Sequence, residues 1–596
     1  MNPEQLLQHF DRISEAPDAI PRLRRFILDL AVRGKLVEQD PNDEPVVCLL
    51  AINDRERQDK SKLDHRADLE QQELLAEEHR WAVPSSWAWR GLADIVLFID
   101  YRGKTPTKTA AGVRLITAKN VKQGYINLSP DEFLAEPDYQ KWMTRGVPKI
   151  GDVLFTTEAP MGNAAVVRLS DKFALAQRVI CFHPYTQLNS DFLVLQLLAQ
   201  PFQFILDKTA TGLTAKGIKA AKLKRLPIAI PPLAEQNRIV AKVDELMALC
   251  DQLQAAQTER EQSRDRLVAA SLQSLNPPAD DEAANAPETQ REQARFLFNH
   301  LPRLTTRPAH IKQLRQTILN LAVRGKLVAQ DPNDEPVSIT LEKSRAQNFK
   351  RWNEDLLNRG IDGSKKCPSR YKELTEPNTK VLFALPMLWN WVCWESILAF
   401  GEGTFKRGPF GSALTKSIFV SSGYKVYEQY CPINDDCSFA RYYITPEKFK
   451  ELEGFAVKAG DFLISCSGVT LGRITQVPND YEEGVINQAL LRVRTDKTLV
   501  DDAFFKMLFR SPYFQTQIFS NSMGMAIPNV KGVAELKAIP LPLPPLAEQH
   551  RIVAKVDELM ALCDQLETQL ADTANDSRRL LEAVLHDALL PADVAA

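Results

Sequence analysis

Two short stretches in the first third of the chain combine side chains that contact phosphates with side chains that hydrogen-bond to the edges of bases. Arginine and lysine suit guanine, asparagine and glutamine suit adenine, and flanking lysines hold a phosphate backbone. This pattern predicts contact with nucleic acid, although solvated surface loops are rich in the same residue types. The candidates are Arg102, Lys104 and Thr105 in the stretch 101–106, and Lys119, Asn120, Lys122 and Gln123 in the stretch 119–123.

Similar polar residues recur further along the chain. Thr156 and Ser465 each follow a Gly-Asp pair and precede a glycine, and small residues let the backbone approach a phosphate closely. An ordinary strand and turn is the alternative interpretation. Glycine-containing loops carry Lys216, Lys219 and Lys531, which would meet phosphates or remain solvated. The parallel candidates in the second half are Lys406, Arg407, Ser412, Lys416, Gln429 and Asn434.

Local charge supports nucleic-acid binding in the first half only. The whole chain has 74 basic and 76 acidic residues, so it is not a polycation. Residues 81–230 contain 19 Lys and Arg against 11 Asp and Glu, an excess of +8 that fits phosphate contacts. Residues 383–543 contain 16 of each sign, so a binding role for this region is inferred by symmetry with the first.

Catalytic motifs are missing. The chain has no G-x-x-x-x-G-K-[ST] phosphate loop, and its nine cysteines and eight histidines show no metal-ligand spacing. Asn276-Pro277-Pro278 lacks the aromatic residue of a methyltransferase motif, and the glycines after Phe400 have the wrong spacing for an S-adenosylmethionine loop. We therefore predict a protein with no catalytic residue, no metal and no cofactor of its own.

Composition predicts a cytoplasmic protein that does not cross a membrane. Scattered cysteines suit a reducing compartment, and the N-terminal residues do not read as a signal peptide. The most apolar window, residues 381–400, carries Pro386, Asn390 and Glu395 and is better explained as the start of a globular domain.

A nearly perfect repeat organises the chain. Residues 231–253 return as 544–566 with one difference, Asn237 against His550, and Pro-Pro before an acidic first turn predicts a helix start. Apolar residues at gaps of four and three predict a helix-pairing seam, and the identical polar residues predict an outer face for a shared partner. A simple amphipathic helix on a core and a recent duplication are the alternatives. The seam is Ile239, Val243, Leu246 and their copies Ile552, Val556, Leu559; the outer face includes Glu235, Arg238, Glu548 and Arg551.

A second repeat precedes each globular region. Residues 24–46 recur as residues 315–337, and each copy predicts a helix that ends near Gly34 or Gly325. Both globular regions begin with the motif Pro-x-x-Trp-x-Trp. The globular regions otherwise hardly resemble each other, which argues against recent duplication. The predicted segments are a conserved helical region at 1–80, a globular domain at 81–230, a conserved helix at 231–275, a flexible linker at 276–293, the second conserved region at 294–380, a second domain at 381–543 and a second conserved helix at 544–596.

This combination resembles the specificity subunit of type I restriction-modification systems over nearly the whole chain. The motif [Ile/Leu]-Pro-Pro-Leu-Ala-Glu-Gln-x-Arg-Ile-Val, found twice, is its most diagnostic part. The resemblance implies a mixed α/β fold, with two target-recognition domains separated by two long antiparallel conserved helices in a pseudo-twofold tandem repeat. It further implies a non-catalytic subunit that reads a bipartite, asymmetric double-stranded DNA target.

Partners are likewise implied by the resemblance. Two methyltransferase subunits would dock on the conserved regions, restriction subunits would join them, and S-adenosylmethionine, ATP and Mg²⁺ would bind on those partners. The extended N-terminal repeat and long linker suggest a larger subclass. The alternatives are a specificity component of another DNA methyltransferase or phage-defence assembly, and a coiled-coil scaffold that binds only protein.

Overall fold

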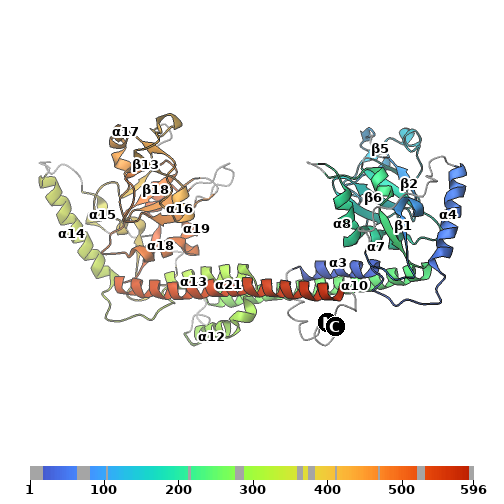
Figure 1. Cartoon of the computed structure of the whole chain (residues 1–596). Helices are drawn as coiled ribbons and strands as arrows, with labels where there is room; N and C mark the ends of the chain where they lie inside the picture. Colours follow the sequence, from blue (N-terminus) through green and yellow to red (C-terminus); the bar gives the residue numbers. More distant parts are fainter. Residues whose placement is uncertain are drawn as a thin grey trace. The chain divides into compact units, whose positions relative to one another are not determined.

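The computed structural model describes residues 16, 18–63, 81–101, 105–176, 178–212, 216–275, 287–358, 367–373, 377, 383–409, 413–467, 470–519 and 530–589. The chain divides into two units. The first unit contains residues 1–260 and 573–596, and the second contains residues 261–572. Figure 1 shows helices and strands in both units, as the predicted mixed α/β fold requires.

The globular part of the first unit begins and ends on one two-stranded ribbon. Strand β1 (Ala88–Gly91) pairs antiparallel with β10 (Pro227–Ile230), so that Ala88 lies opposite Ile230. The intervening chain leaves β1 and returns at β10, directly before the long helix α10 (Leu233–Ser274). The ribbon therefore connects the globular part of this unit to its helical part.

Two sheets form the body of the first unit. The larger is antiparallel, in the order β2-β9-β6-β7, and the smaller has the order β3-β5-β4-β8 with β4 parallel to β8. Figure 1 shows α7 and α8 between these strands and helix α3 (Ala19–Val32). The bounds are β2 Val96–Asp100, β3 Lys108–Thr109, β4 Val113–Ile116, β5 Phe133–Leu134, β6 Val153–Thr157, β7 Met161–Val166, β8 Phe173–Leu175, β9 Val179–Pro184, α4 Val46–Leu63, α5 Leu92–Ile95, η2 Glu136–Asp138, α6 Tyr139–Trp142, α7 Ser190–Leu198, α8 Gln200–Thr209 and α9 Ala220–Lys224.

The second unit repeats most of this topology with a different sequence, although its described strands include no counterpart of β3. Its sheets have the orders β12-β18-β15-β16 and β14-β13-β17, and β11 pairs with β19 as β1 pairs with β10. Strand β13 is again parallel to its partner β17. The strands are β11 Asn390–Cys393, β12 Phe405–Arg407, β13 Tyr424–Tyr427, β14 Tyr443–Ile444, β15 Phe462–Ser465, β16 Ile474–Gln476, β17 Gly484–Ile486, β18 Leu490–Val493 and β19 Pro540–Leu543.

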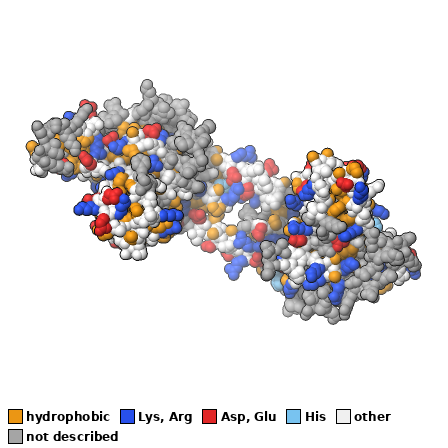
Figure 2. Space-filling view, turned by 90° about the horizontal axis from the view of Figure 1, so that it is seen from above, with side chains coloured by type: hydrophobic (Ala, Val, Ile, Leu, Met, Phe, Trp, Pro, Cys, Tyr) orange, Lys and Arg blue, Asp and Glu red, His pale blue; other side chains and the backbone are white. Residues whose placement is uncertain are grey.

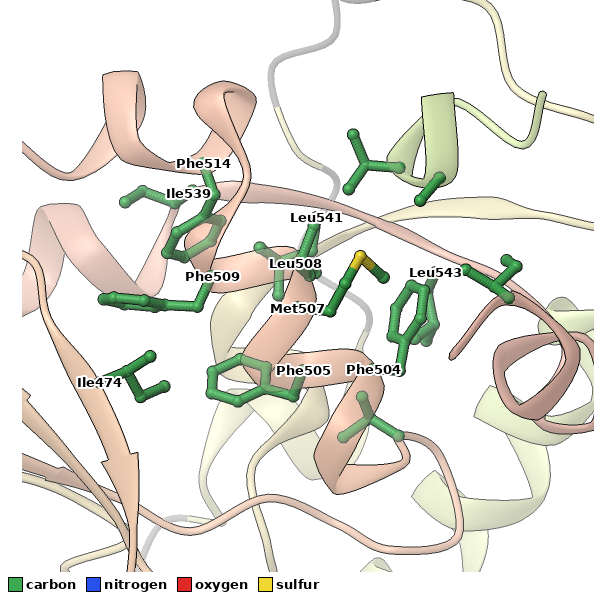
Figure 3. Close-up of a cluster of buried hydrophobic side chains, with 14 of the residues drawn as sticks. Ile474, Phe504, Phe505, Met507, Leu508, Phe509, Phe514, Ile539, Leu541 and Leu543 are labelled. Carbon is green, nitrogen blue, oxygen red and sulfur yellow. The ribbon is translucent and has the colours of Figure 1, made fainter. Parts of the chain in front are cut away.

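Helices fill the corresponding places in the second unit. They are α12 Pro287–Leu304, α13 Pro308–Val323, α14 Val337–Asn358, α15 Ser369–Lys372, η3 Trp394–Ile397, η5 Lys416–Ile418, α16 Tyr430–Asn434, α17 Pro446–Glu451, η6 Glu453–Phe455, α18 Asp502–Arg510, α19 Pro512–Ile518, α20 Val533–Lys537 and α21 Leu546–Leu589. Figure 3 shows Phe505 of α18 on the side of Ile474 in the sheet, whereas Leu508 lies near Leu541 and Phe504 near Leu543 of β19. This apolar core joins the sheet to the ribbon.

Both predicted conserved helices are present. Helix α10 begins two residues after Pro231, and α21 begins two residues after Pro544, so each Pro-Pro pair precedes a helix as expected. Helices α3 and α13 end at Val32 and Val323, just before the predicted glycines. The predicted linker, residues 276–293, is corrected at its end, because residues 287–293 belong to α12. Leu297 of this helix is buried in the core of the second unit. Residues 276–286 lie outside the described part of the chain.

Candidate nucleic-acid interface

A small pocket lies beyond the carboxyl ends of the parallel strands β4 and β8 in the first unit. Its volume is about 160 Å³. Lys119, which the sequence analysis selected as a candidate for nucleic-acid contact, lines the pocket, and its side chain is exposed. Side chains of both signs and several small residues line the pocket: Thr105, Lys108, Thr117, Ala118, Lys119, Glu132, Ala159, Ala176 and Arg178. The pocket therefore offers both hydrogen-bond donors and acceptors.

Arg178 reaches this pocket from an unusual backbone conformation. Its φ is 69°, in the left-handed region that costs about 1–2 kcal/mol for a residue other than glycine. Two hydrogen bonds fix this conformation, because the carbonyl of Arg178 accepts from the backbone N–H and the hydroxyl of Thr157, at 2.8 and 3.2 Å. Its guanidinium is 48% exposed and lies 3.5 Å from the carboxylate of Glu158. Sequence reasoning missed Arg178, because no local motif marks a left-handed arginine.

A tight hairpin next to the pocket carries two further candidates. The backbone N–H of Lys122 donates to the carbonyl of Tyr125 at 2.9 Å, and Gly124 has a φ of 88° that favours glycine at the tip. Gln123 is exposed, and Tyr125, which the sequence analysis did not select, is 59% exposed. The tip thus presents a cation, an amide and an aromatic ring. Arg102 and Lys104 lie outside the described residues.

Asn120 supports this hairpin instead of forming part of its outer face. It is 1% exposed, accepts a hydrogen bond from the N–H of Thr117 at 3.0 Å, and donates to the carbonyl of Asn127 at 3.0 Å. The prediction that Asn120 reads a base is therefore corrected. Asparagine commonly satisfies nearby backbone groups in turns, and this alternative use explains its place in the stretch.

Thr156 and Ser465 are corrected for the same reason. Both are fully buried in central strands. The hydroxyl of Thr156 accepts from the N–H of Asn163 at 2.9 Å, and that of Ser465 accepts from the N–H of Arg473 at 3.0 Å. The two residues occupy equivalent positions and hold equivalent strands together, so the ordinary structural interpretation is the right one.

The Gly-Asp pair before each of these strands is also structural. Asp152 and Asp461 each accept a backbone N–H three residues upstream at 2.8 Å. Asp152 then contacts His183 Nδ1 at 2.6 Å, whereas Asp461 accepts from Arg494 at 2.6 and 3.0 Å. Because β6 and β15 pair in the same register with β9 and β18, His183 and Arg494 are equivalent. The predicted correspondence of these segments is confirmed.

The lysines before the long helices are placed differently from one another. Lys216 forms an ion pair with Asp207 at 2.6 Å, so part of its charge is neutralised within the domain. Lys219 is exposed at the start of α9, and Lys531 is half-buried with its N–H donated to Ile518. Lys219 therefore has the best access to a phosphate among these three.

The second unit presents an aromatic surface in place of the basic pocket. Tyr430, the first residue of α16, has its ring centre 4.1 Å from that of Phe439 in a tilted arrangement. With Ile433, these two residues form an exposed apolar patch beyond strand β13. Apolar groups can contact the methyl group of thymine. The local charge balance indicated that this region differs from the first, but the aromatic pair was not predicted.

The predicted polar residues around this patch are largely engaged within the domain. Gln429 donates to the carbonyl of Ser467, and Asn434 donates to the carbonyl of Tyr430 at 3.0 Å. Lys406 lies 4.1 Å from the centre of the Phe455 ring, and Arg407 is half-buried in β12. Lys416 is exposed, and Ser412 lies outside the described residues.

The identical polar residues at the start of α10 form an internal clamp. Glu235 is 1% exposed and accepts hydrogen bonds from Trp87 Nε1 at 3.0 Å and Gln39 Nε2 at 2.7 Å. Arg238 donates two hydrogen bonds to Asp43, at 3.0 and 2.7 Å. We call Gln39, Asp43, Trp87, Glu235 and Arg238 the first clamp. It joins the N-terminal repeat, the Pro-x-x-Trp motif and the long helix.

The second clamp repeats these contacts. Glu548 is buried and accepts from Trp389 Nε1 at 2.9 Å and from Gln330 Nε2 at 3.3 Å, while Arg551 donates to Asp334 at 2.6 Å. Burial raises the pKa of the Glu548 carboxyl and of its counterpart in the first clamp. We define the second clamp as Gln330, Asp334, Trp389, Glu548 and Arg551.

The clamps correct the predicted docking face. Glu235, Arg238, Glu548 and Arg551 are repeated because each fixes its own domain, so their identity does not require an external partner. Seam residues behave similarly: Ile239 and Val243 are buried with Trp87 and Phe192 in one cluster, and Ile552 and Val556 are buried in the second unit. Leu246 and Leu559 are partly buried at the edges of these clusters.

Leucines one turn further along remain exposed in both copies. Leu249 and Leu562 are each 47% exposed. In the second unit, Leu562 borders an apolar groove of about 180 Å³ between α13 and α21, lined by Leu314, Ile318, Leu559, Leu562, Cys563, Gln565, Leu566 and Gln569. These leucines place the same exposed apolar residue at equivalent positions of both long helices.

The described part of the chain shows neither a metal-ligand cluster nor a membrane-spanning helix. No group of three or more His, Cys, Asp or Glu there could hold a metal ion, and no described helix is long and apolar enough to span a membrane. On the described part of the face visible in Figure 2, lysine and arginine side chains are interspersed with acidic, apolar and neutral ones. Recognition on these domains therefore depends on local groups of side chains.

Known proteins resemble this chain. A family model described as the type I restriction modification DNA specificity domain matches residues 91–261 and 414–575. The chain is 27% identical to the EcoAI specificity subunit of Escherichia coli, a type I restriction enzyme subunit, over 592 residues that cover 96% of this chain and 94% of that protein. It is 25% identical to the corresponding EcoEI subunit over 593 residues, with the same coverage.

Among solved structures, the chain resembles the HsdS subunit from Thermoanaerobacter tengcongensis, with 18% identity and a TM-score of 0.40, over 86% of this chain and 99% of that one. A chain in a structure of a type I R-M system is also 18% identical, with a TM-score of 0.45, over 85% of this chain and 99% of that one.

Two domains of one topology, each with its own surface and both held by the same clamp, define a tandem DNA-recognition protein. The family match covers more than half of the chain. The chain belongs to the type I restriction-modification DNA specificity family, whose members are the DNA-recognition components of these systems.

Proposed function

We propose that each globular domain of this specificity subunit reads one half of a bipartite, asymmetric DNA target. The observation that carries this proposal is the contrast between one shared topology and two unlike surfaces. The first domain has a basic pocket and the second an aromatic patch at corresponding strand ends. Two different surfaces would select two different half-sites, because direct readout depends on the identity of the contacting side chains.

Two methyltransferase subunits would dock on the conserved helical regions, and restriction subunits would join through them. The exposed Leu249 and Leu562 support this because they present the same apolar residue on both copies of one helix. Exposed apolar groups bordering a groove are typical of protein interaction sites. S-adenosylmethionine, ATP and Mg²⁺ would bind on those cytoplasmic partners, so that this chain contributes sequence recognition without catalysis.

An exchange of domains tests the proposal. The ribbons β1–β10 and β11–β19 have equivalent ends, so residues 390–543 can replace residues 88–230 without altering either long helix. The expected result is that the resulting chain selects a DNA site whose two parts have the same sequence. The parent chain serves as the control and should select two different parts. An unchanged asymmetric site in the exchanged chain would refute the assignment of one half-site to each domain.

A further inference from the structure

One carboxylate oxygen in the pocket of the first domain lacks a hydrogen-bond donor. Glu132 Oε1 forms an ion pair with Lys108 at 2.8 Å. Glu132 Oε2 is buried, and no group in the described part of the chain donates to it. Buried acceptors are nearly always satisfied in proteins, so this oxygen suggests a donor supplied by a ligand. Lys108 is 46% exposed and has room to move when a ligand enters.

Arg178 supplies complementary donors in the same pocket. Its guanidinium is half exposed, and its contact with Glu158, at 3.5 Å, is too long to occupy it with a strong hydrogen bond. The pocket wall between the charged groups consists of Ala118, Ala159 and Ala176, which leave space for a flat group. Ala159 is itself left-handed, with a φ of 43°. Two strained residues therefore shape one pocket, an arrangement that clusters at ligand sites.

The mixture of charges favours a base pair over a phosphate. A phosphate would meet the carboxylates of Glu132 and Glu158 as well as the cations, and like charges repel. A guanine presents two acceptors in the major groove, O6 and N7, and its paired cytosine presents an amino donor. Arginine donors beside a carboxylate acceptor match this pattern.

We propose that Arg178 determines specificity in the first half-site by donating two hydrogen bonds to guanine O6 and N7, with Glu132 Oε2 accepting from the amino group of the paired cytosine. This inference rests on the proposed function, because it assigns the residues through which the first domain reads its half-site. The left-handed backbone of Arg178 directs its long side chain into the pocket, and the two hydrogen bonds from Thr157 fix this backbone at the strand end. The equivalent position in the second domain, set by the shared register of β9 and β18, is Ala489, which has no reading group.

The variant Arg178→Gly separates recognition from folding. Glycine adopts a φ of 69° without strain, so the variant should unfold at the same temperature as the parent or at a higher one. Arg168→Gly removes another exposed arginine of this domain, one that pairs with Asp191 outside the pocket, and serves as the matched control. The full-length chains are tested by selection from randomised double-stranded DNA, followed by binding assays at several salt concentrations.

We expect the preference of Arg178→Gly for guanine at one position of one half-site to be roughly tenfold to a hundredfold lower than that of the parent chain, while its preference at the other half-site is unchanged. Glu132→Gln should weaken selection of the same base pair. An unchanged selected site would overturn the proposal. So would a uniform loss of affinity with a salt slope reduced by about 1, which is the behaviour of a phosphate contact. If the parent chain selected no sequence at all, the proposed function itself would fail, and the inference with it.

Discussion

Replacing Gly325 by alanine should loosen the second clamp. Gly325 has a φ of 67°, which costs an alanine about 1–2 kcal/mol. An added Cβ would also lie 2.4 Å from Pro386 Cγ and 3.2 Å from Trp389 Cζ2. Trp389 is buried and bonded to Glu548, so it has little freedom to move away. Overpacking of this kind costs about 1–3 kcal/mol, for a total of about 2–5 kcal/mol.

Gly460→Ala in the same unit is the matched control. Gly460 has a φ of 79°, but an added Cβ would meet no atom within 4 Å, so only the backbone term of about 1–2 kcal/mol applies. This variant therefore carries left-handed backbone strain at a turn away from the clamp and makes no contact with Pro386 or Trp389. A chain of several domains does not unfold in one transition, so a global melting temperature would mix the clamp with other regions.

Amide hydrogen exchange of residues 310–323 and 546–560 measures the opening of the clamp directly. The expected loss of about 2–5 kcal/mol at the clamp in Gly325→Ala corresponds to exchange that is roughly thirtyfold to several thousandfold faster than in Gly460→Ala. The same region should be nearly unaffected in Gly460→Ala. If residues 310–323 and 546–560 exchanged equally fast in both variants, the packing of Gly325 against Pro386 and Trp389 would not be what stabilises the start of α21.

The clamps and exposed leucines lead to further predictions. Asp334→Asn should weaken the bidentate pairing with Arg551 and destabilise the clamp by about 1 kcal/mol, whereas Lys555→Gln, in an exposed ion pair, should change exchange rates little. Burial raises the pKa of the Glu548 carboxyl above its usual 4.5, so the folded state binds this proton more tightly than the unfolded state does. Lowering the pH from 7 towards 4.5 should therefore stabilise the clamp of the parent chain relative to that of Glu548→Gln. Parallel profiles of clamp stability against pH in the two chains would contradict this. Leu562→Ser should weaken pull-down of the methyltransferase subunit without altering the selected DNA sequence, and unchanged pull-down would remove this surface from the docking proposal.

The helical parts of the fold were predictable because their signals are local. A Pro-Pro pair, a glycine after an apolar helix and repeats at 3.6-residue spacing located the starts of α10 and α21 and the ends of α3 and α13. The tandem repeat of two similar domains was predicted, but the strand orders and registers within the domains were not predictable from the residue pattern. Strand partners are distant along the chain, and the two cores fill one topology with different apolar residues, as cores tolerate when volume and pattern are kept.

The candidate site was less accessible to sequence reasoning than the fold. Residue type alone cannot distinguish Lys119, which is exposed at the pocket, from Asn120, which is buried next to it and bonds to the backbone. Repetition was equally ambiguous: the copies of Glu235 and Arg238 indicated an external partner, yet each binds within its own half. Arg178 belongs to the pocket only because distant segments fold together, and its left-handed conformation has no signature in sequence.

We propose that this chain selects a two-part DNA sequence for a methyltransferase. The proposal is tested by expressing the chain with its methyltransferase subunit in a host and mapping methyladenine by single-molecule sequencing. We expect a gapped, asymmetric methylated motif that appears only when the chain is present, and that keeps one part while losing the other when residues 88–230 are exchanged. A well-formed complex that produces no new motif, or a motif that the exchange leaves intact, would contradict it.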